Sequence, residues 1–291
     1  MSDQAEALRQ MVGMNGATKT DGLGEMRIIT VASGKGGVGK SNFSVNLGLA
    51  MQALGYAPLI LDADFGLANV EIILGERPQF NLSHLLKGQC QIQDIVSTSK
   101  YGIPFISGGS GIKDMNFLPA YQIDKVSMQL AELSTLTNML IIDTGAGIND
   151  VVVKFCKLAH EVYIVVTPEP TSVTDGYALI KTLISQFKLE ASIKVIVNKA
   201  MSQEEAHEVF HKLYYVTQQF LNKAIQYGGF IPYDEQLFKS VKEQIPIFKY
   251  NPQAKSSIAY YQIAKIITGS KATPSYQKEN WISRFKKIFS Q

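Results

Sequence analysis

Eight consecutive residues carry the strongest chemical signal in the chain. They read Gly34-Lys35-Gly36-Gly37-Val38-Gly39-Lys40-Ser41, between an apolar run that predicts a strand and a pattern that predicts a helix. Glycines let backbone N–H groups converge on an anion at a helix N-terminus, where the helix dipole also favours negative charge. The spacing G-x-x-x-x-G-K-[ST] therefore predicts a loop that binds nucleotide phosphates. Lys40 would contact the β- and γ-phosphates, and Ser41 would be a Mg²⁺ ligand.

Carboxylates follow two further apolar runs. Asp62 and Asp64 come at the end of the run at 58–62, and Asp143 ends the run at 139–143. Parallel sheets bind ligands beyond the carboxyl ends of their strands, so these side chains are predicted to face the phosphate loop. One carboxylate would hold Mg²⁺-bound water while another orients the water that attacks the phosphate; Asp62 and Asp143 are the metal candidates. Taken alone, such aspartates also cap ordinary turns.

Strand and helix patterns alternate around these motifs. Short apolar runs predict buried strands, and longer patterns at 41–54, 173–187 and 203–224 predict helices. The predicted strands are 27–32, 58–62, 103–107, 139–143, 162–167, 194–198 and 229–232. This order predicts one α/β domain over 26–268, a P-loop NTPase fold with a mostly parallel sheet flanked by helices. Residues 1–25 are expected to form an N-terminal helix and linker, and 269–291 a linker and an amphipathic helix.

Composition excludes several other classes. The net charge of +3 comes from 28 Lys plus Arg against 25 Asp plus Glu, too little for a protein covered in nucleic acid. That excess lies at 278–291, which holds four cations and one anion. No apolar run approaches the ~20 residues of a spanning helix, and the N-terminus lacks the apolar core of a signal peptide. Cys90 and Cys156 have no metal-site spacing. We therefore expect a cytoplasmic protein.

The extra lysine at position 35 makes the phosphate loop similar to that of the deviant Walker A ATPases, the MinD/ParA class. The resemblance implies that Lys35 reaches the partner's phosphates in an ATP-bound dimer. The segment 62–69 resembles the switch I segment of MinD-like proteins, which implies that Asp64 governs hydrolysis. Met201 stands where a GTPase N-K-x-D motif has the aspartate that binds guanine, so ATP is the expected nucleotide. Asn198 and the Pro232-Tyr233-Asp234 loop resemble the family's adenine-flanking segments.

The C-terminal segment has an amphipathic pattern. At the helical step of 100° per residue, five apolar side chains fall on one face and the cations on the other: Trp281, Ile282, Phe285, Ile288 and Phe289. This pattern predicts an interfacial helix that binds an anionic membrane reversibly. The alternative is a C-terminal helix that docks onto the domain.

The N-terminal segment resembles the D-Q-A-x-x-L-R head of the FlhG/FleN flagellar number regulators. The matching residues are Asp3, Gln4, Leu8 and Arg9. The resemblance implies that this head stimulates the SRP-type GTPase FlhF, and that basal-body or regulatory components are further partners. We thus predict a dimerising, membrane-recruited ATPase that uses ATP and Mg²⁺ to regulate flagellar number or placement. The alternatives are a MinD-type regulator of the division site and a ParA-type DNA-partition ATPase, although the balanced charge of the domain argues against nucleic acid as a partner.

Overall fold

The computed structural model describes residues 26–66, 69–109, 128–130, 132–269 and 281–289. The predicted N-terminal helix, with Asp3, Gln4, Leu8 and Arg9, lies outside this part of the chain. Among the helices in the described ranges, none is both long enough and apolar enough to cross a membrane.

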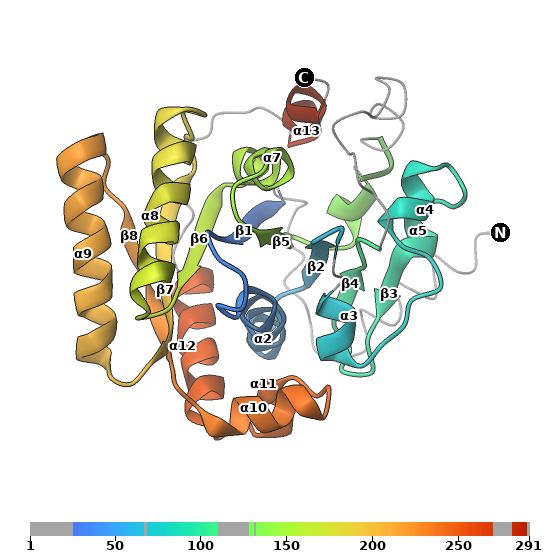
Figure 1. Cartoon of the computed structure of the whole chain (residues 1–291). Coiled ribbons are helices and arrows are strands. Elements are labelled where there is room, and N and C mark those ends of the chain that lie inside the picture. The colour runs from blue at the N-terminus through green and yellow to red at the C-terminus, as the bar shows by residue number, and fades with distance from the viewer. Residues whose placement is uncertain (1–25, 67–68, 110–127, 131, 270–280, 290–291) are drawn as a thin grey trace.

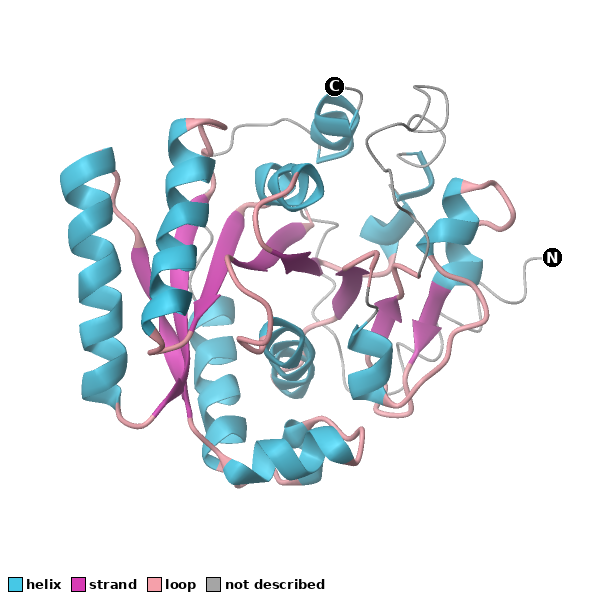
Figure 2. Ribbon diagram, in the orientation of Figure 1, coloured by secondary structure: helices cyan, strands magenta, loops and turns pink. Residues whose placement is uncertain are grey.

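An eight-stranded sheet forms the centre of the molecule (Figures 1 and 2). Its order is β3-β4-β2-β5-β1-β6-β7-β8, and every neighbouring pair is parallel except β3 with β4 at one edge. The strands are β1 (Arg27–Ser33), β2 (Pro58–Ala63), β3 (Val96–Thr98), β4 (Pro104–Ile106), β5 (Met139–Ala146), β6 (Glu161–Val166), β7 (Ser192–Ala200) and β8 (Gln226–Pro232).

Helices connect the strands and cover both faces of the sheet. They are α2 (Lys40–Ala53), α3 (Asn69–Leu74), α4 (Leu82–Leu86), α5 (Ile92–Ile95), α7 (Asp150–Leu158), α8 (Pro170–Ser185), α9 (Gln203–Leu221), α10 (Glu235–Lys242), α11 (Ile247–Tyr250), α12 (Lys255–Gly269) and α13 (Trp281–Phe289), with a 3₁₀ turn at Glu132–Thr135. Figure 1 shows α7, α8 and α9 on one face of the sheet, and α2 and α12 on the other.

Strand β1 shows why the strands are continuous apolar runs. Successive side chains of a strand point to opposite faces of the sheet. Ile28 and Ala32 belong to the core beneath α7, α8 and α9, whereas Ile29 and Val31 belong to the core beneath α2 and α12. Because both faces are covered by helices, both sets of side chains are buried.

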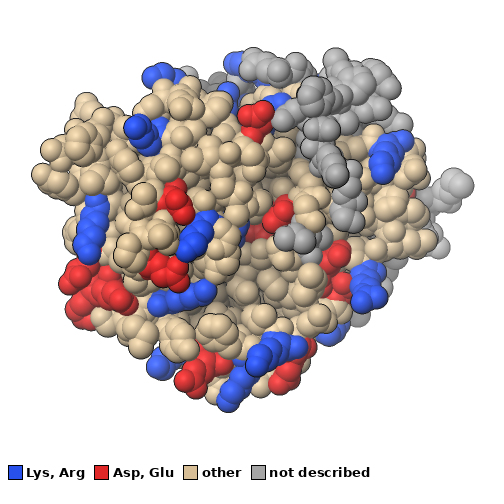
Figure 3. All heavy atoms as spheres, viewed as in Figure 1, with Lys and Arg blue, Asp and Glu red and all other residues tan. Residues whose placement is uncertain are grey.

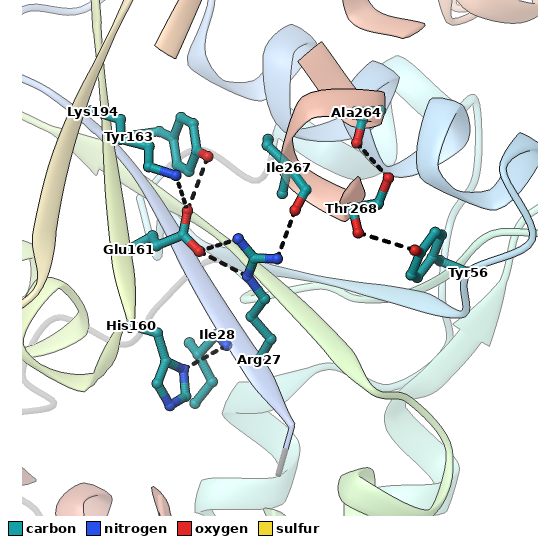
Figure 4. Close-up of polar contacts among 10 residues, drawn as sticks. All are labelled: Arg27, Ile28, Tyr56, His160, Glu161, Tyr163, Lys194, Ala264, Ile267 and Thr268. Atoms are coloured by element: carbon teal, nitrogen blue, oxygen red, sulfur yellow. Dashed lines mark hydrogen bonds and ion pairs between the residues drawn. The ribbon is translucent and has the colours of Figure 1, made fainter. Parts of the chain in front are cut away.

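At the end of the sheet away from the phosphate loop, the buried Glu161 pairs with two partly buried cations (Figure 4). Arg27 pairs with Glu161, which also accepts a hydrogen bond from Lys194 Nζ at 2.6 Å. Arg27 Nη1 donates to the carbonyl oxygen of Ile267 at 2.7 Å, and Tyr56 Oη donates to that of Thr268 at 3.1 Å. The C-terminal end of α12 is therefore fastened to this end of the sheet.

The sequence predicted this fold class correctly, because the structure is a single α/β domain with a mostly parallel sheet. All seven predicted strands are present, and their ends differ from the predicted ones by at most three residues. The short antiparallel strand β3 was missed, since three residues are too few to show a period.

Candidate nucleotide-binding site

The phosphate loop joins β1 to α2 and has the backbone that its glycines allow. Gly37 has φ 75° and Gly39 has φ 97°, backbone conformations that residues other than glycine rarely adopt. A Cβ on Gly34 would lie 2.1 Å from the carbonyl oxygen of Asp175, and one on Gly39 would lie 2.3 Å from Asn198 Nδ2. The loop is therefore packed closely between α8 and the end of β7, and larger residues would displace it.

Lys40 begins α2 and is buried, with 7% of its surface exposed. Burial lowers the pKa of Lys40, and the negative charges of the three nearby aspartates oppose this shift only in part. A buried ammonium at a helix N-terminus is unfavourable by itself, because both carry positive charge. Phosphate oxygens at this position would stabilise both, as the sequence motif predicted.

Asp62 and Asp143 occupy opposite positions on the neighbouring strands β2 and β5. Both side chains are fully buried. Burial raises the pKa of Asp62, and repulsion by Asp143 raises it further. Burial likewise raises the pKa of Asp143, although neighbouring hydroxyl groups and Lys40 offset part of the shift. The site therefore holds more negative charge than its own residues neutralise.

The two carboxylates differ in their hydrogen bonds. Asp62 Oδ1 and Oδ2 accept the backbone N–H groups of Asp64 and Val70, each at 3.0 Å, so Asp62 shapes the turn that carries Asp64. Asp143 Oδ1 accepts a hydrogen bond from Ser44 Oγ at 2.9 Å. Its Oδ2 is buried without a hydrogen-bond partner in the described residues. That oxygen is the one with capacity for a metal-bound water.

These residues fit Mg²⁺ held together with a nucleotide. Within the described ranges, no three His, Cys, Asp or Glu side chains form a group that could hold a metal ion alone. Mg²⁺ usually keeps several waters and binds through one or two protein oxygens plus phosphates. Ser41 and Asp143 would hold the Mg²⁺ ion, and Asp62 on the neighbouring strand would add negative charge to the site. The ion would neutralise charge on the phosphates.

Asp64 lies in the turn that follows β2. Its Oδ1 accepts the backbone N–H of Gly66 at 3.3 Å. Asp64 Oδ1 also lies 3.6 Å from the position that a Cβ on Gly145 would occupy, so Asp64 faces the C-terminal end of β5. The turn after β2 and the C-terminal end of β5 thus meet at Asp64.

The side chain of Lys35 is bound by two residues of the same chain at the start of α8. Its Nζ lies 3.1 Å from Glu169 Oε2 and 2.9 Å from Thr171 Oγ1, at the start of α8. Sequence reasoning did not predict these two contacts, because the partners lie 134 and 136 residues along the chain. Because 39% of the Lys35 side chain is exposed, its ammonium group remains accessible to an anion from another molecule.

The predicted adenine segments lie side by side next to the loop. A hollow of about 150 Å³ is lined by Asn198, Pro232, Tyr233 and Asp234, among others. Asn198 Nδ2 donates to the carbonyl oxygen of Val38 at 2.7 Å. The side chain of Asp234 accepts hydrogen bonds from the backbone N–H groups of Gln236 and Ser256, each at 3.0 Å. Both side chains therefore also hold this part of the fold together.

The C-terminal helix adopts the docked alternative in this structure. Four of its five predicted lipid-facing side chains are buried against the domain, namely Trp281, Phe285, Ile288 and Phe289. The rings of Phe289 and Phe155 of α7 are 5.4 Å apart. Arg284 Nη2 donates to the carbonyl oxygen of Lys157 at 2.7 Å, at the C-terminal end of α7. The predicted membrane contact stays a prediction.

Together, the sheet, the phosphate loop and the buried aspartates define the P-loop class of nucleotide-hydrolysing proteins. A family model described as "ParA: NUBPL iron-transfer P-loop NTPase" matches residues 25–268. The chain belongs to the ParA family of P-loop NTPases, and it is an ATPase that uses Mg²⁺.

Individual relatives refine this assignment. The chain is 40% identical over 240 residues to the antiactivator FleN of Pseudomonas aeruginosa. The matched region covers 82% of this chain and 85% of FleN. The chain is 32% identical over 296 residues to the flagellum site-determining protein YlxH of Helicobacter pylori. This match covers 99% of this chain and 98% of YlxH. In fold it is similar to the septum site-determining protein MinD complexed with Mg-ADP from Pyrococcus horikoshii. The TM-score is 0.67 over 83% of this chain and 96% of that chain, at 23% identity.

The cysteines of this chain do not suit the iron transfer that the family model's description mentions. Burial raises the pKa of the Cys156 thiol to about 12, which disfavours the thiolate that binds metal. Cys90 is partly buried, and burial raises its pKa as well. The sequence had already indicated that their spacing matches no cluster site.

Proposed function

We propose that this ATPase regulates the number or placement of flagella by dimerising with ATP and binding the cytoplasmic membrane reversibly. The observation that carries the proposal is the similarity to FleN and YlxH over most of the chain. Replacing the FleN of Pseudomonas aeruginosa by this chain tests it directly. Normal flagellar counts are expected with the wild-type chain and abnormal counts with Asp64→Ala; abnormal counts with both would contradict the proposal.

Dimerisation would use Lys35. Its contacts with Glu169 and Thr171 are exposed, with 39% and 62% of the Lys35 and Glu169 side chains accessible. Exposed ion pairs contribute only about 0–1 kcal/mol, so phosphates of a second protomer would displace them easily. Lys35→Ala should therefore abolish ATP-dependent dimerisation in light scattering while retaining some nucleotide binding. An unimpaired dimer would contradict the role of Lys35.

Hydrolysis would use Asp64. A water oxygen attacks the γ-phosphorus, the bond to the β–γ bridging oxygen breaks, and ADP and phosphate leave. Asp64 would orient this water, Lys40 would stabilise charge on the phosphates, and Gly145 beside Asp64 would allow the segment to sense the γ-phosphate. Asp64→Ala should give a long-lived dimer in ATP, and a dimer that dissociates at the normal rate would argue against this assignment.

Membrane binding would require α13 to leave the domain. The apolar face that would enter lipid is the face now packed against α7, so the docked and lipid-bound states exclude each other. Helix α7 begins at Asp150, directly after its N-cap Asn149 and the turn at Gly147. A movement of this turn with the nucleotide would therefore shift α7 and weaken its contact with α13. Two released helices in a dimer would bind more strongly than one.

A matched pair of variants tests this step. Arg284→Ala and Lys287→Ala each remove one cation from α13, but only Arg284 is hydrogen-bonded to the end of α7. Without nucleotide, Arg284→Ala should sediment with anionic liposomes more than the wild type, whereas Lys287→Ala should sediment slightly less because it loses lipid attraction. Equal behaviour of the two variants would contradict release of α13 from α7.

The N-terminal head would act on a second protein. By resemblance, Asp3, Gln4, Leu8 and Arg9 would stimulate the GTPase FlhF. A peptide of residues 1–12 should raise the hydrolysis rate of that GTPase, and a peptide with Gln4→Ala and Leu8→Ala should not. Lack of stimulation by the unaltered peptide would favour a MinD-type role in division, the alternative that the fold leaves open.

A DNA-partition role is the other alternative. On the face shown in Figure 3, Lys and Arg are interspersed with Asp and Glu and do not form one basic patch. The net charge of the chain is +3. ATP-dependent, salt-sensitive retention of random DNA would favour this alternative over the proposed function.

A further inference from the structure

The loop that follows β4 lies beside the turn that carries Asp64. Strands β2 and β4 are parallel neighbours in the sheet, and Leu61 lies opposite Ile106 (Figure 1). Asp62 and Ser107 are the next residues of these two strands, so they emerge at the same end of the sheet. This is the end at which parallel sheets bind their ligands. The loop after β4 therefore starts next to the site of hydrolysis.

Gly108 in this loop approaches the turn on both sides of Asp64. A Cβ on Gly108 would lie 2.5 Å from the carbonyl oxygen of Asp62 and 3.0 Å from Cδ1 of Phe65. Only a residue without a side chain can come so close to the backbone of β2. Phe65 is itself buried, and its ring lies 6.4 Å from that of Phe155 of α7. The residues next to Asp64 are thus closely packed.

Ser107 fastens the helix that follows the turn. Its side chain is 1% exposed, and its Oγ donates a hydrogen bond to Oε2 of Glu71 on α3 at 2.7 Å. Hydrogen bonds from a hydroxyl to a carboxylate are stronger than those between neutral groups. The carbonyl oxygen of Ser107 accepts the backbone N–H of Leu82 at 2.9 Å, where α4 begins. Ser107 is therefore held by α4 and in turn holds α3.

Helix α3 and the turn are connected to each other as well. The two carboxylate oxygens of Asp62 accept the backbone N–H groups of Asp64 in the turn and of Val70 in α3. Val70 and Leu74 belong to a buried cluster that also contains Phe105 of β4. A shift of α3 would therefore be transmitted to the turn, and the orientation of Asp64 depends on the position of this short helix.

We propose that Ser107 is a positioning residue for ATP hydrolysis. By holding α3 through Glu71, it keeps the Asp64 carboxylate in the orientation that directs the attacking water. Gly108 supports the same turn by close packing. Because Ser107 acts through α3 and the turn, it affects the rate of hydrolysis and not the affinity for ATP. The inference rests on the proposed role of Asp64 in hydrolysis.

A first substitution removes the hydroxyl group. Ser107→Ala should lower kcat about tenfold, because small misplacements of a reacting group can cost up to about 10²-fold. The dissociation constant for Mg-ATP, measured by calorimetry, should not change. An unchanged kcat, or a loss of Mg-ATP affinity by the same factor as the loss of kcat, would overturn the positioning role.

A pair of substitutions at Glu71 tests the same hydrogen bond from its other side. Glu71 is only partly buried, so its variants are expected to fold. Glu71→Leu removes the acceptor and should lower kcat as Ser107→Ala does, whereas Glu71→Gln keeps an acceptor oxygen and should retain most of the wild-type kcat. Equal kcat values for the two Glu71 variants would overturn the role of this bond.

The matched control is Ser99→Ala. Ser99 is also a buried serine next to a strand at this edge of the sheet, and its Oγ accepts the backbone N–H of Tyr101 at 3.3 Å. It lies beside Ile103, at the opposite end of β4 from Ser107. Ser99→Ala should therefore leave kcat unchanged. A loss of kcat as large as that of Ser107→Ala would overturn the inference.

The combination with Asp64→Ala shows whether Ser107 acts through Asp64. In single-turnover measurements, Ser107→Ala should slow the otherwise wild-type protein and should not slow Asp64→Ala further. The same slowing factor in both backgrounds would overturn the inference. Hydrolysis at the normal rate by Asp64→Ala alone would contradict the proposed function. A slow Asp64→Ala with a normal Ser107→Ala would overturn only this inference.

Discussion

The two ends of the sheet hold buried charges in opposite ways. At the end near Arg27, Glu161 accepts hydrogen bonds from Arg27, from Lys194 and from Tyr163 Oη at 3.1 Å. Burial alone would raise the pKa of Glu161, but Lys194 and Arg27 outweigh it and hold the pKa below its ordinary value. At the nucleotide end, burial and repulsion raise the pKa of Asp62, and Asp143 has an oxygen without a hydrogen-bond partner in the described part of the chain.

This difference distinguishes a structural cluster from a functional one. A buried carboxylate whose oxygens are all paired with cations or donors is part of the fold's structure, because removal of one partner leaves an unpaired charge and is strongly destabilising. Buried carboxylates that repel one another destabilise the fold until a cation or ligand arrives, and such groups are typical of functional sites. Within one domain, Glu161 is thus an example of a structural carboxylate, and Asp62 and Asp143 are examples of functional ones.

The largest expected effect is on catalysis. Asp143→Asn keeps the shape of the side chain but removes the charge that would hold Mg²⁺-bound water, so the rate of ATP hydrolysis should fall by about 10²–10³-fold. A steady-state phosphate-release assay measures it. Glu161→Gln at the other end should leave the rate within about twofold at a temperature where the variant is folded. A similar loss in both variants would remove the functional distinction between the ends.

The next effect is on stability. Glu161→Gln leaves the partly buried Arg27 and Lys194 without their counter-charge, so the free energy of unfolding should fall by about 3 kcal/mol, the lower end of the range for a fully buried pair. Urea denaturation followed by circular dichroism measures this change. The control is Glu208→Gln, since Glu208 lies on the exposed side of α9 and should change stability by less than about 0.5 kcal/mol. Equal effects at the two positions would show that the cluster is not structural.

The pH dependence should have opposite signs at the two ends. Folding lowers the pKa of Glu161, so its stabilisation is present above its ordinary value of 4.5 and is lost as the pH falls through the lower folded value. Folding raises the pKa of Asp143, so its stabilisation is present below its ordinary value of 3.8 and is lost as the pH rises toward the folded value. The two pH dependences have opposite signs because cations pair with Glu161, whereas burial of Asp143 is only partly offset by its neighbours.

Urea denaturation at a series of pH values measures both. The stability difference between the wild type and Glu161→Gln should shrink below pH 4.5. The advantage of Asp143→Asn over the wild type should grow as the pH rises from 3.8 toward neutrality. Parallel pH profiles for the two variants would contradict the comparison.

The smallest effect concerns the end of α12. Tyr56→Phe removes the hydrogen bond from Tyr56 Oη to the carbonyl oxygen of Thr268 and should cost about 1 kcal/mol of stability. Thermal unfolding measures it. Tyr215→Phe serves as the control, because Tyr215 is 65% exposed on α9 and should unfold as the wild type does. No difference between the two variants would show that this bond does not fasten α12.

Local patterns allowed most of the fold and the centre of the site to be predicted. The motif at 34–41 and the apolar runs before Asp62 and Asp143 depend on neighbours in sequence, and parallel strand order brings their ends together. Partners distant in sequence were not predictable. The contact of Lys35 with Glu169 and the pairing of Arg27 with Glu161 each join residues 134 apart.

For the C-terminal helix, the sequence pattern predicted the helix but not what its apolar face contacts. Its amphipathic pattern predicted a helix with one apolar face, and Trp281–Phe289 is such a helix. The pattern could not tell lipid from protein as the cover for that face, because both are apolar. In the structure the docked helix contacts α7, whose Lys157 carbonyl oxygen accepts a hydrogen bond from Arg284 and whose Phe155 ring contacts Phe289.

One measurement tests most directly the central claim that the nucleotide end is destabilised until Mg-nucleotide binds. It compares the thermal unfolding of the wild type and Asp143→Asn, each with and without Mg²⁺ and a non-hydrolysable ATP analogue. Without ligand, Asp143→Asn should unfold at the same temperature as the wild type or higher, and with ligand the wild type should gain clearly more stability. An Asp143→Asn variant that is less stable without ligand, and gains as much as the wild type with it, would contradict the account.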